Sequence, residues 1–344
     1  MDYDVTVVTV VYELVKCGRK DMFRQCVDSV AKQEGVRIEH IIVDGGSADG
    51  TKELILECAG GRENVSWISE TDNGIYDAMN KGLRQAKGRY VTFLNSDDYY
   101  HDSNGLRNVV AALDSSKADF SYAPAVIINR DGTPACDNPH ERPDLRNLLK
   151  GMPFSHQSEL VRTDLMREIG GFSAAYPRSA DFALLMEFVF AGKKAIRTEN
   201  AFVTFRRGGF SSENPAESKR EHLAAFSDLP RRYLGRELTE KEMRAYVYTC
   251  ILRTFGAHAL RDGWYGAEND IPPLVADAFA KLARLEREVR ALKHSKAYRA
   301  GMIVTWPARK AWGGVKCLRE NGVKYTVRHA AGKVLRTFGF KCIW

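Results

Sequence analysis

The first 125 residues alternate between short β-rich runs and segments with helical spacing, and this alternation constrains the fold more than any other feature. Uninterrupted apolar or β-branched runs occupy residues 5–11, 38–43, 65–68 and 90–94. Helical patterns occupy residues 22–31, 51–58, 75–86 and 106–113. Runs without polar alternation are typical of strands buried on both faces, and strand–helix repeats predict right-handed βαβ units. We therefore expect an α/β fold with a doubly wound sheet in this half of the chain.

The pattern is mixed between residues 125 and 212 and becomes helical after that. Further elements are expected as a helix at 181–191, strands at 194–198 and 201–205, and helices at 215–233 and 239–260. Asn214 followed by Pro215 is a typical helix start, and Thr239 with Glu242 forms a capping box.

Composition and cysteine usage exclude several classes of protein. Of the 344 residues 44% are apolar and 28% charged, which is an ordinary globular mixture. The seven cysteines are scattered and form no Cys-x-x-Cys pair, which argues against a disulfide framework or a thiolate zinc site and favours a reducing compartment. No apolar run approaches the roughly 18–20 residues that a membrane span needs, and the first residues lack the basic start of a signal peptide. We expect a cytoplasmic protein that does not cross a membrane.

Ligand-binding side chains are expected after the strands, because doubly wound sheets bind ligands beyond the carboxyl ends of their strands. The four segments that follow the runs are residues 12–13 (YE), 44–47 (DGGS), 70–74 (ETDNG) and 95–98 (NSDD). Three of these segments contain an aspartate, so the sequence predicts an acidic edge of the sheet.

Asp97 and Asp98 are the sharpest local feature of this edge. Two neighbouring carboxylates at the mouth of a buried strand face desolvation and mutual repulsion, which a divalent cation would relieve. Mg²⁺ and Mn²⁺ prefer hard oxygen ligands, often one or two carboxylates together with substrate phosphates. The alternative is a solvated Asp-Asp turn that binds nothing.

Residues 44–51 (DGGSADGT) also allow two interpretations. In the first, Asp44 accepts a hydrogen bond from a nucleobase and the glycines clear space for it. In the second, Ser47 or Asp49 caps the following helix and the loop binds nothing. Neither a Gly-x-Gly-x-x-Gly dinucleotide pattern nor a Walker loop occurs in the chain, which disfavours nicotinamide and P-loop chemistry.

Seven segments, taken in order, resemble the motifs of the family 2 glycosyltransferases, and of its WcaA-like branch. They are residues 41–51 (IIVDGGSADGT), 68–82 (ISETDNGIYDAMNKG), 93–98 (FLNSDD), 153–158 (PFSHQS), 170–173 (GGFS), 178–185 (RSADFALL) and 207–211 (RGGFS). The resemblance implies a GT-A fold, a Rossmann-like mixed sheet flanked by helices, and an inverting transfer from a nucleotide sugar. It does not cover residues 213–344.

The resemblance also implies roles for individual residues. Asp181 matches the catalytic base, and Asp97 with Asp98 matches the metal motif, which would hold Mn²⁺ or Mg²⁺. The residues implied in nucleotide binding are Thr9, Tyr12, Asp44, Asp72 and Asp97. The family favours UDP over dTDP or GDP.

Three other residues at the predicted site have open alternatives. His156 and Gln157 contact the diphosphate or the acceptor, or are structural residues of a loop. The segment at 206–209 (RRGG) closes over the diphosphate as a flexible basic loop, with Arg207 as the contact, or is a solvated turn. Asp181 itself opens a predicted helix, where an acid is favoured by the helix dipole whatever its function.

The end of the chain carries most of the positive charge. Residues 293–344 contain twelve Lys and Arg but one acid, a charge of +11, which leaves −4 of the total +7 for the rest. Apolar residues at heptad-like spacing between 278 and 292 predict a short helix that packs on the enzyme or forms a homodimer. The tryptophans and cations that follow are typical of a helix at an anionic membrane surface; a packing face and nucleic-acid binding are alternatives, and we do not expect nucleic acid.

We therefore expect three segments: a GT-A catalytic domain at 1–212, a helical extension at 213–275, and a short heptad helix with a basic amphipathic tail at 276–344. Within the first, residues 1–125 form the nucleotide-sugar half and 126–212 the acceptor half. The expected acceptor is a lipid-linked saccharide used in cell-surface polysaccharide synthesis, and the expected location is the inner face of the membrane. The alternatives are a catalytically silent, membrane-associated scaffold and a sugar nucleotidyltransferase.

Overall fold

The computed structural model describes residues 3–135, 151–209 and 214–236, with isolated positions between 140 and 148 and between 238 and 255. Its helices are α1 (Lys20–Ala31), α2 (Thr51–Ala59), α3 (Ile75–Gln85), α4 (Gly105–Ser116), α5 (Thr163–Ile169), α6 (Ala180–Phe190) and α7 (Pro215–Leu234), with a 3-10 turn, η2, at His156–Ser158. Its strands are β1 (Val5–Val11), β2 (Ile38–Asp44), β3 (Val65–Ser69), β4 (Tyr90–Phe93), β5 (Tyr99–Tyr100), β6 (Phe120–Tyr122), β7 (Ala125–Ile128), β8 (His140–Glu141), β9 (Leu160–Arg162), β10 (Ala195–Arg197) and β11 (Val203–Arg206). Every strand and helix expected in the first 125 residues is present.

The strands form a larger and a smaller sheet. The larger sheet has the order β10-β6-β9-β4-β1-β2-β3, and the smaller has the order β5-β11-β7-β8. β1 pairs in parallel with β2 and β4, and β2 pairs in parallel with β3. β9 runs antiparallel to both β4 and β6. The mixed α/β sheet flanked by helices is confirmed, and β9 is the strand that makes it mixed.

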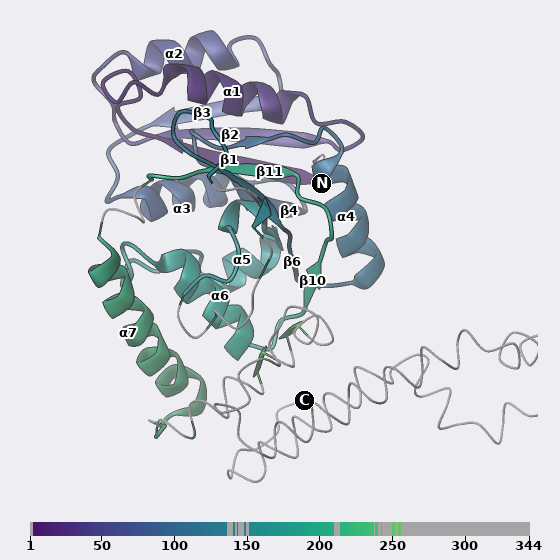
Figure 1. Cartoon of the computed structure of the whole chain (residues 1–344), viewed down its shortest axis with the longest axis vertical. Helices are drawn as coiled ribbons and strands as arrows, with labels where there is room; N and C mark the ends of the chain where they lie inside the picture. Colours follow the sequence, from purple (N-terminus) through teal and green to yellow (C-terminus); the bar gives the residue numbers. More distant parts are fainter. Residues whose placement is uncertain are drawn as a thin grey trace, which may run out of the picture.

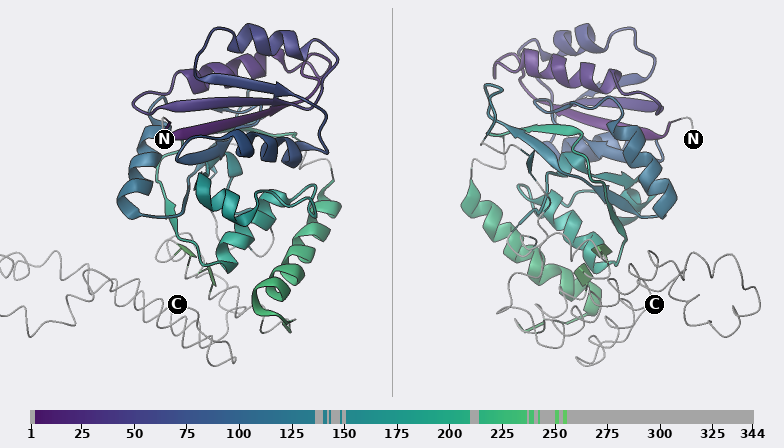
Figure 2. Two further views of the ribbon diagram at one scale, coloured as in Figure 1. Left: turned by 180° about the vertical axis from the view of Figure 1, so that it is seen from behind. Right: turned by 45° about the vertical axis from the view of Figure 1, so that its right-hand side comes forward.

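Helices cover both faces of the larger sheet (Figure 1). Alternate residues of β1 enter different cores: Val8 and Val10 pack with α3, whereas Val11 packs with α1 and α2. Figure 2 shows the same layers from behind, with α1 and α2 on one side of the strands and α3 on the other. This two-sided burial explains why the strand runs lack polar alternation.

The predicted starts of two helices are present. α7 begins at Pro215, and the Asn214 side chain accepts a hydrogen bond from Glu217 N at 3.2 Å. Thr239 and Glu242 make both bonds of a capping box, with Glu242 accepting from Thr239 N at 2.9 Å and donating its own N–H to Thr239 Oγ1 at 3.3 Å. Most of the expected helix at 239–260 lies outside the described residues.

The heptad helix and the basic tail at 276–344 also lie outside the described residues, so the segment boundaries stay predictions.

α7 packs closely on α6: the centre of the Phe182 ring lies 4.2 Å from that of the His222 ring and 5.7 Å from that of the Phe226 ring. In the part of the chain that the structure describes, no helix is both long enough and apolar enough to span a bilayer.

Candidate active site

The loops that follow β1, β2, β3 and β4 gather at one edge of the larger sheet. The strands are parallel, and their register places Asp44 opposite both Val11 and Ser69. The segments that sequence patterns single out therefore come together, as parallel pairing requires.

Asp44, the last residue of β2, is fully buried. Its carboxylate accepts hydrogen bonds from Ser47 Oγ at 2.5 Å and from Ser69 Oγ at 2.6 Å. Ser47 Oγ in turn accepts the Glu13 N–H at 2.8 Å. Asp44 therefore ties together the loops that follow β1, β2 and β3, and its contact with a nucleobase stays a prediction. Ser47 does not cap α2 either, since α2 begins after Gly50 without a side-chain cap.

Thr9 faces the interior rather than the loops. It has no exposed surface, and its Oγ1 lies 3.0 Å from His40 Nε2 and 3.9 Å from Cys26 Sγ, under α1. Burial lowers the pKa of His40 to about 3, so the pair is a neutral hydrogen bond of the core. The Thr9 side chain therefore packs in the core, because every second residue of a strand points to the same face. A contact from Thr9 to a nucleotide stays a prediction.

Tyr12 and Asp72 flank a glycine at the open side of this edge. The Tyr12 side chain is 59% exposed, and a Cβ built on Gly45 would lie 2.5 Å from Asp72 Oδ2 and 3.2 Å from Tyr12 Cδ2. Asp72 also accepts the Gly74 N–H at 2.9 Å. The missing side chain at position 45 thus lets an aromatic ring and a carboxylate stand side by side.

Asp98 is buried in the loop between β4 and β5, whereas the neighbouring Asp97 is partly exposed. The Asp98 carboxylate accepts Gln157 Nε2 at 2.8 Å and the Arg206 N–H at 2.8 Å. The pKa of Asp98 is raised well above its usual value. Burial of the carboxyl is the largest cause, and the negative charge of Asp97 is the second. Asp97 Oδ2 lies 3.9 Å from the Arg19 guanidinium. The pair is therefore not a solvated turn.

Asp181 lies in the first turn of α6, and its carboxylate is held from two sides. Its Oδ1 accepts Tyr76 Oη at 2.9 Å and the Phe182 N–H at 2.8 Å. Its Oδ2 lies 3.7 Å from His156 Nδ1, and 17% of the side chain is exposed. Burial and the charge of Asp181 raise the pKa of Tyr76 well above its usual value, so the phenol remains a hydrogen-bond donor.

The short turn η2 spans the two carboxylate centres. His156 faces Asp181, and the next residue, Gln157, bonds Asp98. Residues from three separate sequence motifs, which contain Asp98, the pair His156-Gln157 and Asp181, therefore lie next to one another. The predicted loop around His156 and Gln157 is a 3-10 turn, too short for sequence periodicity to reveal.

Arg206 belongs to the predicted basic loop, but its contact with Asp98 was not predicted. It is buried, and in addition to its N–H bond to Asp98, its Nε donates to the Asp97 carbonyl at 3.0 Å and its guanidinium donates to Gln25 Oε1 at 3.0 Å. Arg207 was predicted as the diphosphate contact of this loop. Arg207 is exposed, and its backbone N–H donates to the Ile128 carbonyl at 2.9 Å.

The side chains around Asp98 fit a hard divalent cation. Two carboxylates adjoin there, and Gln157 Oε1 is a buried oxygen without a hydrogen-bond partner. The described residues contain no cluster of three or more His, Cys, Asp or Glu side chains suited to a metal. A site of one or two carboxylates completed by phosphate oxygens is the type that Mg²⁺ and Mn²⁺ use.

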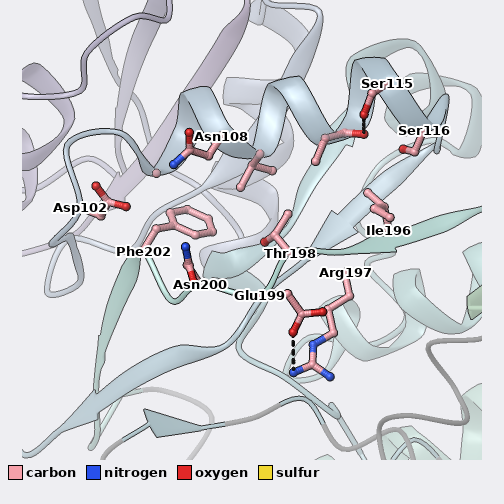
Figure 3. A pocket seen from close by; sticks show the side chains of 13 residues that line it. Asp102, Asn108, Ser115, Ser116, Ile196, Arg197, Thr198, Glu199, Asn200 and Phe202 are labelled. Carbon is pink, nitrogen blue, oxygen red and sulfur yellow. Dashed lines mark hydrogen bonds and ion pairs between the residues drawn. The ribbon is translucent and has the colours of Figure 1, made fainter. Parts of the chain in front are cut away.

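A larger cavity lies elsewhere, between α4 and the segment from β10 to Phe202 (Figure 3). Its volume is about 350 Å³, and Asp102, Asn108, Glu199 and Asn200 are among its polar lining residues. It shares no residue with the carboxylate centres, so its size does not make it the reaction site.

Comparison with known proteins identifies relatives. The family model described as Glycosyl transferase family 2 matches residues 6–182. An uncharacterized glycosyltransferase of Mycobacterium tuberculosis is 28% identical over 240 residues, covering 66% of this chain and 88% of that protein. A PGL/p-HBAD biosynthesis glycosyltransferase of Mycobacterium bovis is 31% identical over 162 residues, covering 46% of this chain and 60% of that protein.

Solved structures share the fold at low sequence identity. Staphylococcus aureus TarS 1–349 in complex with UDP-GlcNAc has a TM-score of 0.52 at 17% identity, covering 99% of this chain and 93% of that one. The mannosyltransferase PcManGT from Pyrobaculum calidifontis, in complex with GDP-Man and Mn²⁺, has a TM-score of 0.50 at 17% identity, covering 99% and 89%.

Proposed function

Because the chain belongs to glycosyl transferase family 2, we propose that it transfers a sugar from a nucleoside diphosphate to an acceptor hydroxyl, with inversion at the anomeric carbon. The observation that carries this proposal is the span of η2, whose consecutive residues His156 and Gln157 face Asp181 and bond Asp98. A base for the acceptor and a pair of carboxylates for the leaving diphosphate thus stand on either side of one turn.

The nucleoside side of the donor lies against Tyr12 and Asp72 in this proposal. An exposed aromatic ring is a stacking surface for a base, and the neighbouring carboxylate is an acceptor for its N–H or for a ribose hydroxyl. Asp44 holds the surrounding loops in place through its hydrogen bonds with Ser47 and Ser69. UDP is the proposed nucleotide, which is consistent with the UDP-GlcNAc that TarS binds.

Asp98 and Asp97 hold Mn²⁺ or Mg²⁺ in this proposal, as PcManGT carries Mn²⁺. The ion, when bound, neutralises charge that develops on the departing diphosphate. Gln157 and the Arg206 N–H fix the orientation of the Asp98 carboxylate. Arg207 is exposed on the loop after β11, where it can approach the diphosphate.

Asp181 is the proposed base of the displacement. The acceptor oxygen bonds to the anomeric carbon while the bond from that carbon to the diphosphate oxygen breaks. The electron pair leaves with the diphosphate, and the acceptor proton passes to Asp181. Attack from the face opposite the leaving group inverts the configuration. Tyr76 and the Phe182 N–H keep the carboxylate oriented for this transfer.

The acceptor is proposed to be a saccharide carried on a lipid at the cytoplasmic membrane surface. The proposal rests on the basic, tryptophan-containing segment at 293–344, whose charge suits an anionic leaflet. A peripheral enzyme would meet such an acceptor in the plane of the membrane.

The substitution Asp181→Asn tests the role of the base. We expect the rate at which UDP is released from UDP-glucose, UDP-galactose or UDP-GlcNAc, with water or a saccharide panel as acceptor, to fall about 100- to 10,000-fold. The affinity for UDP is expected to stay unchanged, because Asp181 acts on the acceptor side.

Asp164→Asn is the matched control, since Asp164 also lies in the first turn of a helix but is 68% exposed. It is expected to keep the wild-type rate. Wild-type turnover in the Asp181→Asn enzyme would remove Asp181 from the reaction.

A further inference from the structure

A small cavity adjoins His156, the residue that faces the proposed base. It measures about 10 Å³ and is lined by apolar side chains of β4, β9, α5 and α6, among them Phe93, Met166 and Leu184. Two polar side chains also line it, His156 and Glu159. This volume is roughly the space that the centre of one water molecule needs.

Each of the two polar residues has an atom without a partner. His156 Nε2 and Glu159 Oε1 are buried and make no hydrogen bond to the protein. A buried polar atom in a protein is normally hydrogen-bonded, often through an internal water. The shared cavity offers these two atoms the same bridging molecule.

Burial favours the neutral form of both side chains. Burial, followed by the charge of Asp181, raises the pKa of the Glu159 carboxyl well above its usual value. Burial lowers the pKa of His156. Glu159 is then an O–H donor, and neutral His156 is a donor at one ring nitrogen and an acceptor at the other.

We propose that Glu159 is a positioning residue that, through one buried water, makes His156 Nε2 an acceptor and so directs the Nδ1–H of His156 at Asp181. Hydrogen bonds run from the Glu159 O–H to water and from water to Nε2. The Nδ1–H then points toward Asp181 Oδ2, 3.7 Å away, in an electrostatic contact longer than a hydrogen bond. This inference rests on the proposed function, in which Asp181 is the base.

The consequence is an N–H donor aimed at the carboxylate of the proposed base. An N–H donor stabilises a carboxylate, and the tautomer of a histidine is set by the partner of its other nitrogen. The groups that bear on Asp181 are Tyr76 of α3, His156 of η2 and Glu159, while Glu221 of α7 acts on Tyr76. Of these, Glu159 is the one whose effect passes through the histidine ring.

Nitrogen-15 spectra of the histidine rings at neutral pH test this arrangement in full-length protein. The chain has eight histidines, and a His156→Gln sample identifies the signal of His156. We expect Nδ1–H and an acceptor Nε2 in the wild type. Glu159→Leu should move the ring toward the Nε2–H tautomer, whereas Glu159→Gln, whose amide still donates, should preserve the wild-type spectrum.

The pH dependence of kcat/KM gives a second readout, namely the pH at which its acid limb falls. Glu159→Leu is expected to move this limb up by roughly half a unit to one unit, the size of ordinary shifts in folded proteins, and Glu159→Gln to leave it in place. Glu168→Leu, at a 68% exposed position of α5, is the control for an added leucine. An unchanged His156 spectrum in Glu159→Leu, or a changed spectrum with an unmoved limb, would overturn the inference.

The two readouts separate this inference from the proposed function. If the wild type transfers no sugar from any donor, the proposed function fails, and the ring spectrum still decides whether Glu159 sets the state of His156. If the leucine variant does not fold, Glu159→Gln still tests the inference, because a changed His156 spectrum in that variant would overturn it.

Discussion

Tyr12 stands out at the scale of single residues because its large aromatic side chain is 59% exposed, while most aromatic side chains are largely buried. It lies over Gly45, next to Asp72. An aromatic ring in this place leaves apolar surface in contact with water, and a stacked base would cover that surface.

Tyr12→Ala is expected to weaken UDP binding about 5- to 150-fold, because stacking of a base on an aromatic ring is worth about 1–3 kcal/mol. The melting temperature should be unchanged, since the side chain is exposed. Tyr12→Phe retains the ring and is expected to bind UDP nearly as the wild type does. Calorimetry of the three proteins decides; equal affinity in Tyr12→Ala would exclude stacking at this position.

Residue types at the site were predictable from the sequence, but their orientations were not. Asp97 and Asp98 could be singled out as neighbouring carboxylates after a buried strand, whereas Asp181, an ordinary residue for a helix start, was singled out by the resemblance to family motifs. Thr9 faces the core under α1 because alternate residues of a strand point to opposite faces of the sheet, and the sequence around Thr9 does not show which face α1 covers. The contact of Arg206 with Asp98 joins positions 108 residues apart, so no local pattern could indicate it.

At the scale of elements, Asp4 joins the starts of three strands. Its carboxylate accepts Arg37 N and Nε, at 3.1 and 3.2 Å, just before β2, and Arg89 Nη2 at 3.2 Å just before β4. These bonds lower the pKa of Asp4 from 3.8 to about 2, with the Arg37 side chain as the largest cause.

Asp4→Asn is expected to reduce the free energy of unfolding at pH 7 by about 1 kcal/mol, less than the full shift implies because Arg37 is 63% exposed and screened by solvent. An acid with a lowered folded pKa stabilises above its unfolded pKa, so the loss should shrink as pH falls from about 4 to about 2. Urea unfolding at several pH values measures it. Asp21→Asn, at a 97% exposed site, is the control; a pH-independent difference for Asp4→Asn would contradict the account.

The first half of the fold was predictable at this scale and the second half only in part. β1 to β4 coincide with uninterrupted apolar runs, and the helices between them show helical spacing, so both kinds of element could be identified. β6 and β9 are three residues each, too short to show a period, and β9 joins the sheet antiparallel through contacts distant in sequence. The helix α5 that follows is seven residues long. Sequence motifs thus grouped the residues of the candidate site better than periodicity identified the short elements around them.

At the scale of the whole molecule, charge is divided between a slightly acidic body and a basic end. Removing residues 296–344 is expected to abolish co-sedimentation with vesicles of anionic phospholipid, since each cation near such a surface contributes about 1 kcal/mol. Binding of the intact chain should fall as salt is raised. Vesicles of phosphatidylcholine alone are the control, and unchanged co-sedimentation after the deletion would contradict a membrane role for this segment.

The central claim is that Asp98 and a divalent ion together hold a nucleoside diphosphate, and calorimetry with UDP, dTDP and GDP, with and without Mn²⁺, tests it most directly. Asp98→Asn is the sharpest variant, because the Gln157 amide can turn to keep its bond while the charge is lost. We predict tight binding of one nucleotide, UDP, that requires Mn²⁺, survives Asp181→Asn and is lost in Asp98→Asn. Binding that is absent in the wild type, or equally strong without Mn²⁺ or without the Asp98 charge, would contradict the account.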